Sequence, residues 1–180
     1  MASLLPHKDL VNLPKDFTLV VNTSDPHKHL HSYELIDWLP TEGVCLLLNR
    51  TSYNLKNMLN ILGFDTHKLY FIDTISKRID SKLKTDRTYY LHTNKDLNQI
   101  SNSIEKVSSL MPSGDKFIII DSLHNLLMHH DEKTSLNFLD FINQRLRLLR
   151  LNRIYLTDFN KLKPSIKNKL LKISDRIIHL

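Results

Sequence analysis

Short continuous apolar runs alternate along this chain with longer segments in which apolar residues recur at helical spacing. The runs are rich in β-branched and aromatic residues and end at turn-forming residues, which is typical of strands buried on both faces of a parallel sheet. Strands are therefore predicted at about residues 17–21, 44–48, 68–72, 88–91, 117–120, 153–157 and 175–180.

The segments between these strands predict helices that each turn one apolar face inward. Asp25 can cap the first helix with Pro26 at its first position, and Ser52 is a candidate cap for the second. The helices are expected at about residues 27–39, 52–62, 95–110, 133–149 and 164–171. Because strands and helices alternate, right-handed crossovers should give an α/β fold, a mostly parallel sheet with helices on both faces. The polar residues 74–87 show no period and are expected to form a variable excursion.

At 180 residues the chain is long enough for one domain with a sizeable core. We expect residues 1–16 to form an amino-terminal arm and residues 17–180 to form the domain. A single cysteine, Cys45, excludes an internal disulfide, and its apolar sequence neighbours predict a buried thiol. No apolar run reaches the length of a membrane span and the amino terminus lacks a signal-peptide pattern, so we expect a cytoplasmic protein without a membrane partner.

The most distinctive passage is the run Lys116–Leu123, in which four apolar residues lead into Asp121 and Ser122. An acidic residue at the carboxyl end of a buried parallel strand lies where open α/β sheets bind their ligands. Asp121 therefore has two interpretations. It could hold a magnesium ion, as a strand-end Asp does in P-loop nucleotide hydrolases, or it could cap the following turn with its side chain. Capping is the favoured interpretation.

Four passages, in this order, resemble the RecA-like ATPase fold and particularly the KaiC-like ATPases common in archaea. They are a strand and helix (43–49 and 52–62), a Gly-hydrophobic-Asp passage with the next strand (62–65 and 68–73), a strand that resembles Walker B (117–123) and a late strand (174–180). The resemblance covers residues 17–180 and implies a three-layer RecA-like fold. It also implies a site for ATP and magnesium, and subunits that assemble in rings or filaments.

The phosphate-binding loop of that family is missing from the sequence. Such a loop needs glycines, whose amides wrap the phosphates, and a lysine that neutralises them. The first strand is followed instead by residues 22–29, which contain no glycine, while Pro26 lacks an amide donor and Asp25 adds a negative charge. Lys28 and Ser24 are the residues that could replace the lysine and a hydroxyl of the loop. A non-standard nucleotide site would consist of Ser24, Lys28, Asp121 and Ser122.

The catalytic carboxylates of that family are missing as well. KaiC-like ATPases carry acidic residues after the second strand that help to activate the attacking water, but Asn49, Arg50 and Thr51 stand there. The sequence therefore predicts a non-catalytic RecA/KaiC-like domain, a pseudo-ATPase without a cofactor. We expect it to act as a regulatory or protein-interaction module, with another protein or a second copy as its partner. Binding of ATP and magnesium in a non-standard pocket is one alternative.

Nucleic-acid binding by the carboxyl-terminal part is a second alternative. Residues 141–180 contain ten Lys or Arg against two Asp, a local balance of +8 within a net charge of +6. Such a face can contact phosphates, although solvated helix faces are the commoner reason for such runs and few aromatic residues are interleaved for stacking. The candidate residues are Arg145, Arg147, Arg150, Lys163, Lys167 and Lys169.

The chain also contains ten histidines, some of which cluster. His27 and His31 lie four apart, a spacing that zinc sites use, and a third ligand could come from His124, His129 or His130. Solvent-facing histidines are the favoured interpretation, so the sequence assigns neither a metal site nor a catalytic residue.

Overall fold

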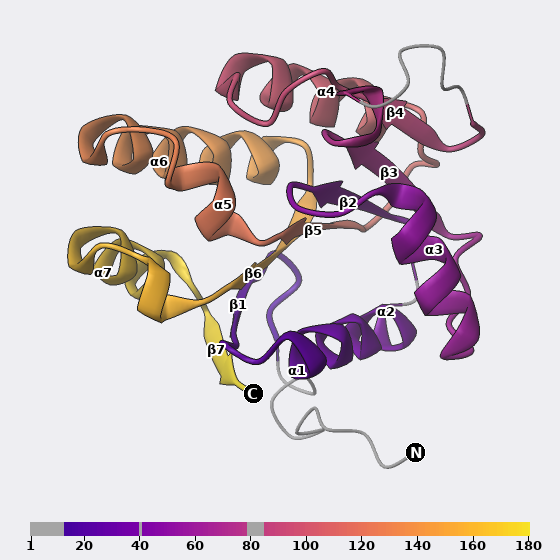
Figure 1. Cartoon of the computed structure of the whole chain (residues 1–180), viewed down its shortest axis with the longest axis horizontal. Helices are drawn as coiled ribbons and strands as arrows, with labels where there is room; N and C mark the ends of the chain where they lie inside the picture. Colours follow the sequence, from indigo (N-terminus) through magenta and orange to yellow (C-terminus); the bar gives the residue numbers. More distant parts are fainter. Residues whose placement is uncertain (1–12, 40, 79–84) are drawn as a thin grey trace.

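The computed structural model describes residues 13–39, 41–78 and 85–180, which form one sheet between two layers of helices (Figure 1). The described strands pair in parallel in the order β4-β3-β2-β5-β6-β1-β7. They are β1 (Thr18–Asn22), β2 (Gly43–Leu47), β3 (Leu69–Asp73), β4 (Thr88–Tyr90), β5 (Lys116–Asp121), β6 (Leu151–Thr157) and β7 (Arg176–His179). The predicted α/β class with a parallel sheet is confirmed.

Helices cover both faces of the sheet, as predicted (Figure 1). One face carries α4 (Leu97–Ser109), α5 (Leu123–Leu127), α6 (Glu132–Leu148) and α7 (Pro164–Ile173). The other carries α1 (Pro26–His31), the 3-10 turn η2 (Ser32–Glu34), α2 (Leu35–Trp38) and α3 (Ser52–Ile61). Two further 3-10 turns, η3 (Ser76–Arg78) and η4 (Phe159–Lys161), lie in connections.

The central strand shows why the apolar runs are continuous. Ile118 and Ile120 of β5 point into the core beneath α4 to α7, whereas Phe117 and Ile119 point into the core beneath α1 to α3. Successive side chains of a strand alternate between faces, so a strand covered on both sides needs apolar residues at every position.

The connection from β1 to β2 has the largest consequence for the site. Because β6 and β5 lie between these two strands, the connection passes over the carboxyl end of β5. It consists of α1, η2 and α2 in close succession, where the sequence predicts one helix at 27–39. Pro26 is the first residue of α1, as predicted, and the Asp25 carbonyl accepts from the His29 amide.

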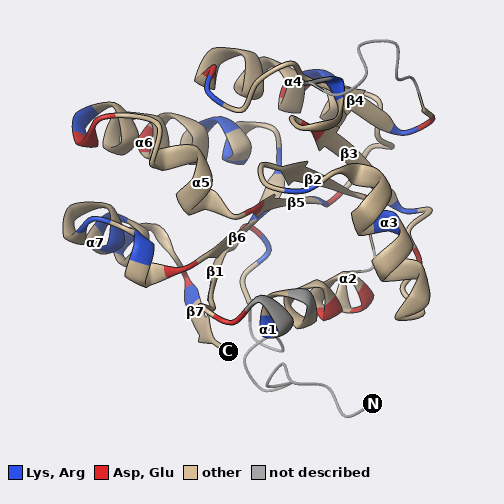
Figure 2. Cartoon of the chain, in the orientation of Figure 1, with Lys and Arg blue, Asp and Glu red and all other residues tan. Residues whose placement is uncertain are grey.

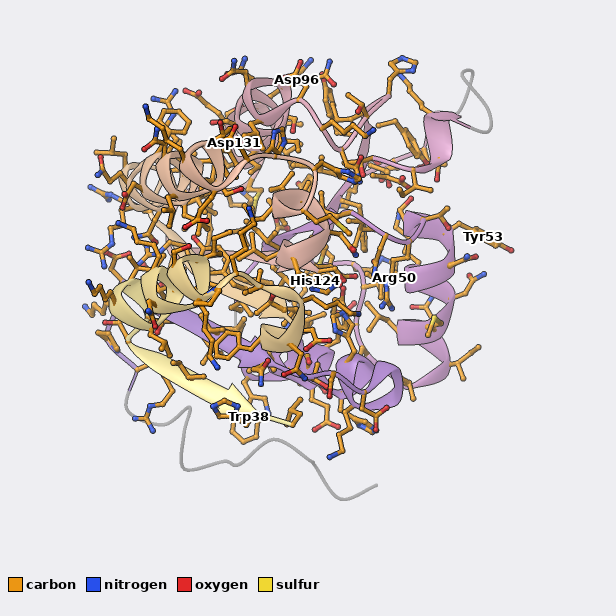
Figure 3. All side chains as sticks on the ribbon, turned by 60° about the vertical axis from the view of Figure 1, so that its left-hand side comes forward. Trp38, Arg50, Tyr53, Asp96, His124 and Asp131 are labelled. Carbon is orange, nitrogen blue, oxygen red and sulfur yellow. The ribbon has the colours of Figure 1, made fainter. Side chains whose placement is uncertain are left out.

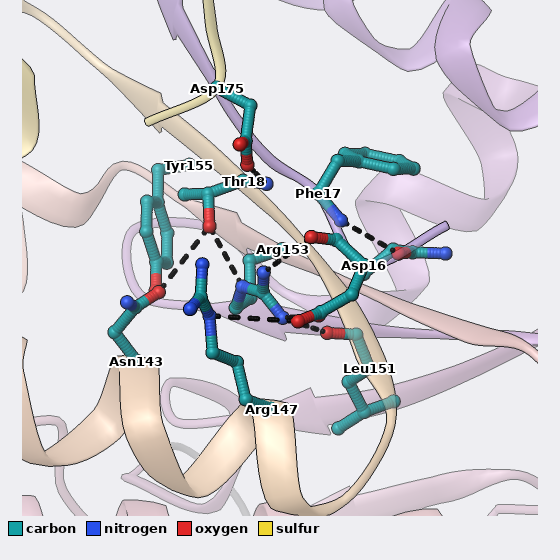
Figure 4. Close-up of polar contacts among 10 residues, drawn as sticks. Asp16, Phe17, Thr18, Asn143, Arg147, Leu151, Arg153, Tyr155 and Asp175 are labelled. Carbon is teal, nitrogen blue, oxygen red and sulfur yellow. Dashed lines mark hydrogen bonds and ion pairs between the residues drawn. The ribbon is translucent and has the colours of Figure 1, made fainter. Parts of the chain in front are cut away.

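A buried arginine stabilises the opposite side of the sheet, where the strands have their amino-terminal ends. Arg153 of β6 is fully buried, its Nε donates to Thr18 Oγ1 at 2.8 Å, and its guanidinium pairs with Asp16 (Figure 4). Asn143 Oδ1 lies 3.4 Å from the same threonine hydroxyl, and Arg147 Nε lies 3.7 Å from Asp16. These contacts hold the start of β1 against β6.

The other predicted elements agree with the structure to within one or two residues at their ends. One detail is wrong: Thr51 rather than Ser52 caps α3, through a hydrogen bond from the Asn54 amide. The short helix α5 is not among the predicted helices. Residues 1–12 of the expected arm and residues 79–84 of the expected excursion lie outside the described residues. Among the described helices, none combines the length and apolar composition that crossing a membrane requires.

Candidate functional site

Asp121 ends β5 and is fully buried, and both oxygens of its carboxylate face side-chain donors. Oδ1 lies 2.6 Å from His29 Nε2 and 3.0 Å from Ser122 Oγ. Oδ2 accepts from the Tyr33 hydroxyl at 2.9 Å and forms an ion pair with Arg50, whose Nε lies 2.9 Å away but makes no hydrogen bond. A carboxylate can only accept hydrogen bonds, so His29 donates its Nε2–H. The chain therefore encloses this carboxylate with its own donors.

The strand order brings these donors together. His29 in α1 and Tyr33 in η2 belong to the connection that passes over β5. Arg50 follows β2, whose Leu47 is level with Asp121 in the parallel pairing. Two separate connections thus converge on the carboxyl end of one strand.

The surroundings favour the ionised form of Asp121. Burial alone would raise its pKa, but the hydrogen bond and charge of His29, the charge of Arg50 and the hydrogen bond from Tyr33 hold the pKa below its usual 3.8. Burial, and then the neighbouring Asp121 charge, raise the pKa of Tyr33 well above its usual 10.0. The tyrosine hydroxyl therefore remains a donor over the whole physiological range.

Ser122 links the ends of two neighbouring strands. It leaves β5 in the left-handed region, with φ 63° and ψ 55°, a conformation that costs a non-glycine residue about 1–2 kcal/mol. Its Oγ accepts from Asn49 Nδ2 at 2.8 Å and donates to Asp121. These side-chain hydrogen bonds offset part of the backbone strain.

A polar cavity of about 170 Å³ opens beside this cluster. Arg50 and His124, which lie close together in Figure 3, both contribute to its wall. The other lining residues are Thr23, Ser24, Asp25, His29, Asn49, Ser122, Asn125, Asp158 and Lys161. Since Lys161 Nζ lies 3.5 Å from Asp158 Oδ2 and Arg50 pairs with Asp121, the cations of this wall are compensated by acids.

His124 is held in its neutral form. Burial lowers its pKa below the usual 6.5, and the nearby Lys161 charge lowers it further. Its Nδ1 accepts from the Asp158 amide at 3.3 Å, which requires that nitrogen to be unprotonated.

The four residues predicted for a non-standard nucleotide site are only partly brought together. Ser24 and Ser122 line the cavity and Asp121 is buried beside it, whereas Lys28 is exposed on α1 and does not line this cavity. The favoured interpretation of Asp121 as a cap is wrong. Its four partners are side chains rather than amides of the next turn, and no side chain caps α5.

Three members of the site were not among the residues predicted for it. The sequence marks Arg50 only as a position without a carboxylate, and His29 and Tyr33 only as part of a predicted helix. A signal for Arg50 exists, because it follows the strand that neighbours β5. That signal depends on the strand order, which the spacing of residues along one chain does not contain.

The cations predicted as a nucleic-acid surface lie at the end of α6, just after it, and at the start of and along α7, which carries basic but no acidic residues (Figure 2). Four of the six are paired with acids. The pairs are Arg145–Glu105, Arg147–Asp16 (3.7 Å), Lys163–Glu132 (4.0 Å) and Lys169–Asp140. Lys167 lies over the Phe159 ring, 5.2 Å from its centroid, and Arg150 is exposed.

The histidines considered as metal ligands do not form a described site. The side chain of His27 lies outside the described residues, and His31 Nδ1 lies 2.7 Å from Glu34 Oε1. Within the part of the chain that the structure describes, no three His, Cys, Asp or Glu side chains are placed to hold a metal ion.

Solved archaeal structures share this architecture. The chain matches the Pyrococcus horikoshii protein PH0321, solved in complex with an unknown peptide, with a TM-score of 0.70 and 10% identity over 96% of this chain and 80% of that chain. It matches the KaiC-like protein PH0186 of the same organism with a TM-score of 0.67 and 16% identity, over 94% and 74% of the two chains. The flagellar accessory protein FlaH of Methanocaldococcus jannaschii matches with a TM-score of 0.60 and 13% identity, over 93% and 72%.

At these identities the likeness concerns the fold alone, and it confirms the predicted three-layer, RecA/KaiC-like architecture. No protein-family model matches the sequence, and a search of curated proteins found no match.

Proposed function

We propose that this RecA/KaiC-like domain has no ATPase activity and acts as a regulatory or protein-interaction module. The observation that carries the proposal is the enclosure of Asp121 by His29, Tyr33 and Arg50. A magnesium ion needs free lone pairs of a carboxylate. To bind one at Asp121, the chain would have to break contacts that stabilise both carboxylate oxygens.

The connection after β1 supports the same proposal. It passes from Asn22 to Pro26 through three residues, none of them glycine, before α1 begins. Pro26 has no amide hydrogen and Asp25 carries a negative charge, so this turn offers a phosphate less than a glycine-rich loop does. Lys28, the candidate replacement for the loop lysine, is exposed.

A hydrolase would also need a base for the attacking water. The positions after β2 hold Asn49, which donates to Ser122, and Arg50, which pairs with Asp121. Neither can take a proton from water. The side chains at the carboxyl ends of these strands therefore bind one another and supply no catalytic base.

An interaction function is supported by the exposed surface and by a protein of the same fold. PH0321 was solved in complex with a peptide, which motivates a peptide or protein partner for this chain. Helix α3 exposes Tyr53 and Ile61, whose exposed fractions are 71% and 84%, and Figure 3 shows Tyr53 pointing away from the body of the domain. Large exposed apolar side chains on one helix offer a contact surface to such a partner or to a second copy.

The decisive test is isothermal titration of the purified protein with ATP and magnesium, combined with a phosphate-release assay. We expect no saturable heat and no release above the buffer rate. Magnesium-dependent release that disappears in Asp121→Asn would overturn the proposal.

A second titration tests the enclosure itself, with Mn²⁺ as the probe. We expect no Mn²⁺ binding to the wild type, and weak binding to the His29→Ala/Arg50→Ala variant, because the two substitutions free one donor contact at each oxygen of Asp121. Adding Asp121→Asn to this variant should abolish the gain. Wild-type binding of Mn²⁺ that requires Asp121 would contradict the enclosure.

Binding of one phosphate group beside Asp121 is a second candidate function, because Ser24, Ser122, Arg50 and Lys161 share a cavity. Its volume of about 170 Å³ lies below the about 300 Å³ at which small-molecule pockets begin, so a phosphate group fits better than a whole nucleotide. Titration with inorganic phosphate tests it. Saturable binding that is lost in Lys161→Ala would support this candidate, and its absence at millimolar phosphate would remove it.

A further inference from the structure

A larger cavity lies at the β4 edge of the sheet, three strands from Asp121. Its volume is about 450 Å³, and residues of β3, β4, the turn before β4 and the end of α4 line it. This volume falls within the about 300–1,000 Å³ typical of sites for small organic groups. It can hold one planar ring system with its substituents.

Tyr70, Arg87 and Tyr89 line this cavity, and each of the two tyrosine rings is paired with a cation. Arg87 Cζ lies 4.8 Å from the centroid of the Tyr70 ring, and Lys106 Nζ lies 4.9 Å from the centroid of the Tyr89 ring. Tyr70 and Tyr89 are partly buried, and both pack against the core beneath α4 to α7. Proteins that bind single-stranded nucleic acids use aromatic rings to stack on the bases, and arginine and lysine to contact the phosphates.

The arginine of this cavity is positioned in advance. Arg87 donates from Nη1 to the His67 carbonyl, and the same nitrogen lies 3.3 Å from Glu42 Oε1. A guanidinium held over a tyrosine ring loses little further freedom when a base stacks against it. Among the ion pairs of the described residues Lys106 takes no part, and its side chain is exposed, so its charge can meet a phosphate.

The remaining wall distinguishes between classes of ligand. Val107 and Leu110 supply apolar surface, and Asp86 supplies acceptors for the amino group of a base. A cationic ligand such as a methylated lysine is disfavoured, because Arg87 and Lys106 already lie against the two rings. Asp86 and Leu110, which also line the cavity, are exposed to solvent.

We propose that this cavity binds a base of single-stranded nucleic acid, stacked against the Tyr70–Arg87 pair and the Tyr89 ring. Lys106 contacts the neighbouring phosphate, and Asp86 favours bases that carry an amino group. The site is separate from Asp121 and from the paired cations of α6 and α7. It goes beyond the proposed function and does not depend on it, because a domain without ATPase activity could carry it equally well.

The test measures fluorescence anisotropy with labelled twelve-nucleotide oligo(rC) and oligo(rU) at two salt concentrations. We expect wild-type affinity to fall as salt rises, and oligo(rC) to bind more tightly than oligo(rU). Lys106→Ala and Tyr89→Leu should each weaken binding about tenfold, whereas Tyr89→Phe should retain it. The matched control is Lys163→Ala/Lys169→Ala, which removes two charges from α7 and should change affinity less than about twofold.

Several results would overturn the proposal: no binding of either oligonucleotide, equal weakening by the α7 control, or no weakening by Lys106→Ala. Because Lys106 is exposed on α4, its alanine variant should fold normally, and so it keeps the test valid even where Tyr89→Leu does not fold. Competition with free AMP separates the two sources of a base. If AMP displaces the oligonucleotide as well as an unlabelled strand does, the site belongs to free nucleotides and the claim for a strand is overturned.

Discussion

Asp73 and Asp121 end two strands that flank β2, and both are level with Leu47 in the parallel pairing. Both are fully buried, and the pKa of each carboxyl is lowered. The partners, however, are of different kinds. The comparison separates a carboxylate that organises backbone from one that organises charged side chains.

Asp73 is bound mainly by backbone amides. Its Oδ1 accepts from the amides of Ile75 at 2.9 Å and Ser76 at 2.8 Å, and its Oδ2 accepts from the Ser52 amide at 2.7 Å and the Ser76 hydroxyl at 2.6 Å. The turn-capping role that the sequence predicts for Asp121 is therefore the one that Asp73 performs. Amides cannot change their donor character, so this site has one arrangement.

Asp121 is bound by groups that can rearrange. The imidazole of His29 can exchange donor and acceptor nitrogens, the Ser122 hydroxyl can rotate, and Arg50 lines a cavity that opens beside it. Asp73 and Asp121 thus occupy equivalent positions, but the structure depends more firmly on Asp73. The following predictions test that difference.

The largest expected effect is that of Asp73→Asn. The side-chain NH2 group of the new asparagine would face a backbone N–H, so that two donors would meet. We therefore expect the free energy of unfolding to fall by about 3 kcal/mol. In Asp121→Asn the His29 and Ser122 side chains can turn an acceptor toward the new amide group, so the loss should be smaller, about 2 kcal/mol. Urea unfolding of both variants measures the difference. Equal losses would show that the two sites are equally rigid.

Acid should destabilise the protein through both carboxyl groups. For Asp73, burial alone would raise the pKa, but the hydrogen bonds from Ser52, Ser76 and Ile75 lower it below 3.8, and the pKa of Asp121 is lowered as well. A lowered folded-state pKa gives stability that is complete above the unfolded value of about 3.9 and is lost as the pH falls through the folded value. Urea unfolding between pH 5 and pH 2.5 should show this loss in the wild type. The Asp73→Asn/Asp121→Asn variant should show a flatter dependence, and an unchanged slope would contradict the assignment.

Deleting one hydroxyl from each site gives a matched pair of smaller changes. Tyr33→Phe removes a fully buried donor to Asp121, and we expect a loss of about 1.5 kcal/mol. Ser76→Ala removes a donor to Asp73, where three amides remain, and about 0.5 kcal/mol should be lost. Thermal and urea unfolding measure both. A larger loss in Ser76→Ala would reverse the comparison.

The last prediction concerns His124, which lines the cavity beside Asp121 and has no counterpart beside Asp73. Because its pKa is lowered below 6.5 in the folded state, the unfolded chain takes up the proton first. Stability is therefore complete above about pH 6.5 and decreases as the pH falls below it. His124→Asn should remove this decrease, which we expect to be under about 1 kcal/mol between pH 7 and pH 5. A wild type that is equally stable at both values would refute the prediction.

The sequence predicts these two regions unequally. Every strand could be placed because its apolar run is local, and both Asp73 and Asp121 could be recognised as strand ends. The sequence does not show which residues bind each of the two carboxylates. Asp73 meets Ile75 and Ser76 within three residues, whereas Asp121 meets His29 across 92 positions and Tyr33 across 88. Long-range contacts depend on the strand order, which here only the resemblance to a known fold implied.

The place of β1 in the sheet also affects how the chain folds while it is being synthesised. This strand lies between β6 and β7, and Arg153 reaches Thr18 across 135 positions of the chain. At about 5–20 residues per second, a ribosome needs about 7–27 s to make that stretch. During this interval the apolar β1 has been made while both of its partner strands are still missing. A nascent chain of this protein therefore carries an unpaired apolar strand until both partner strands have been made.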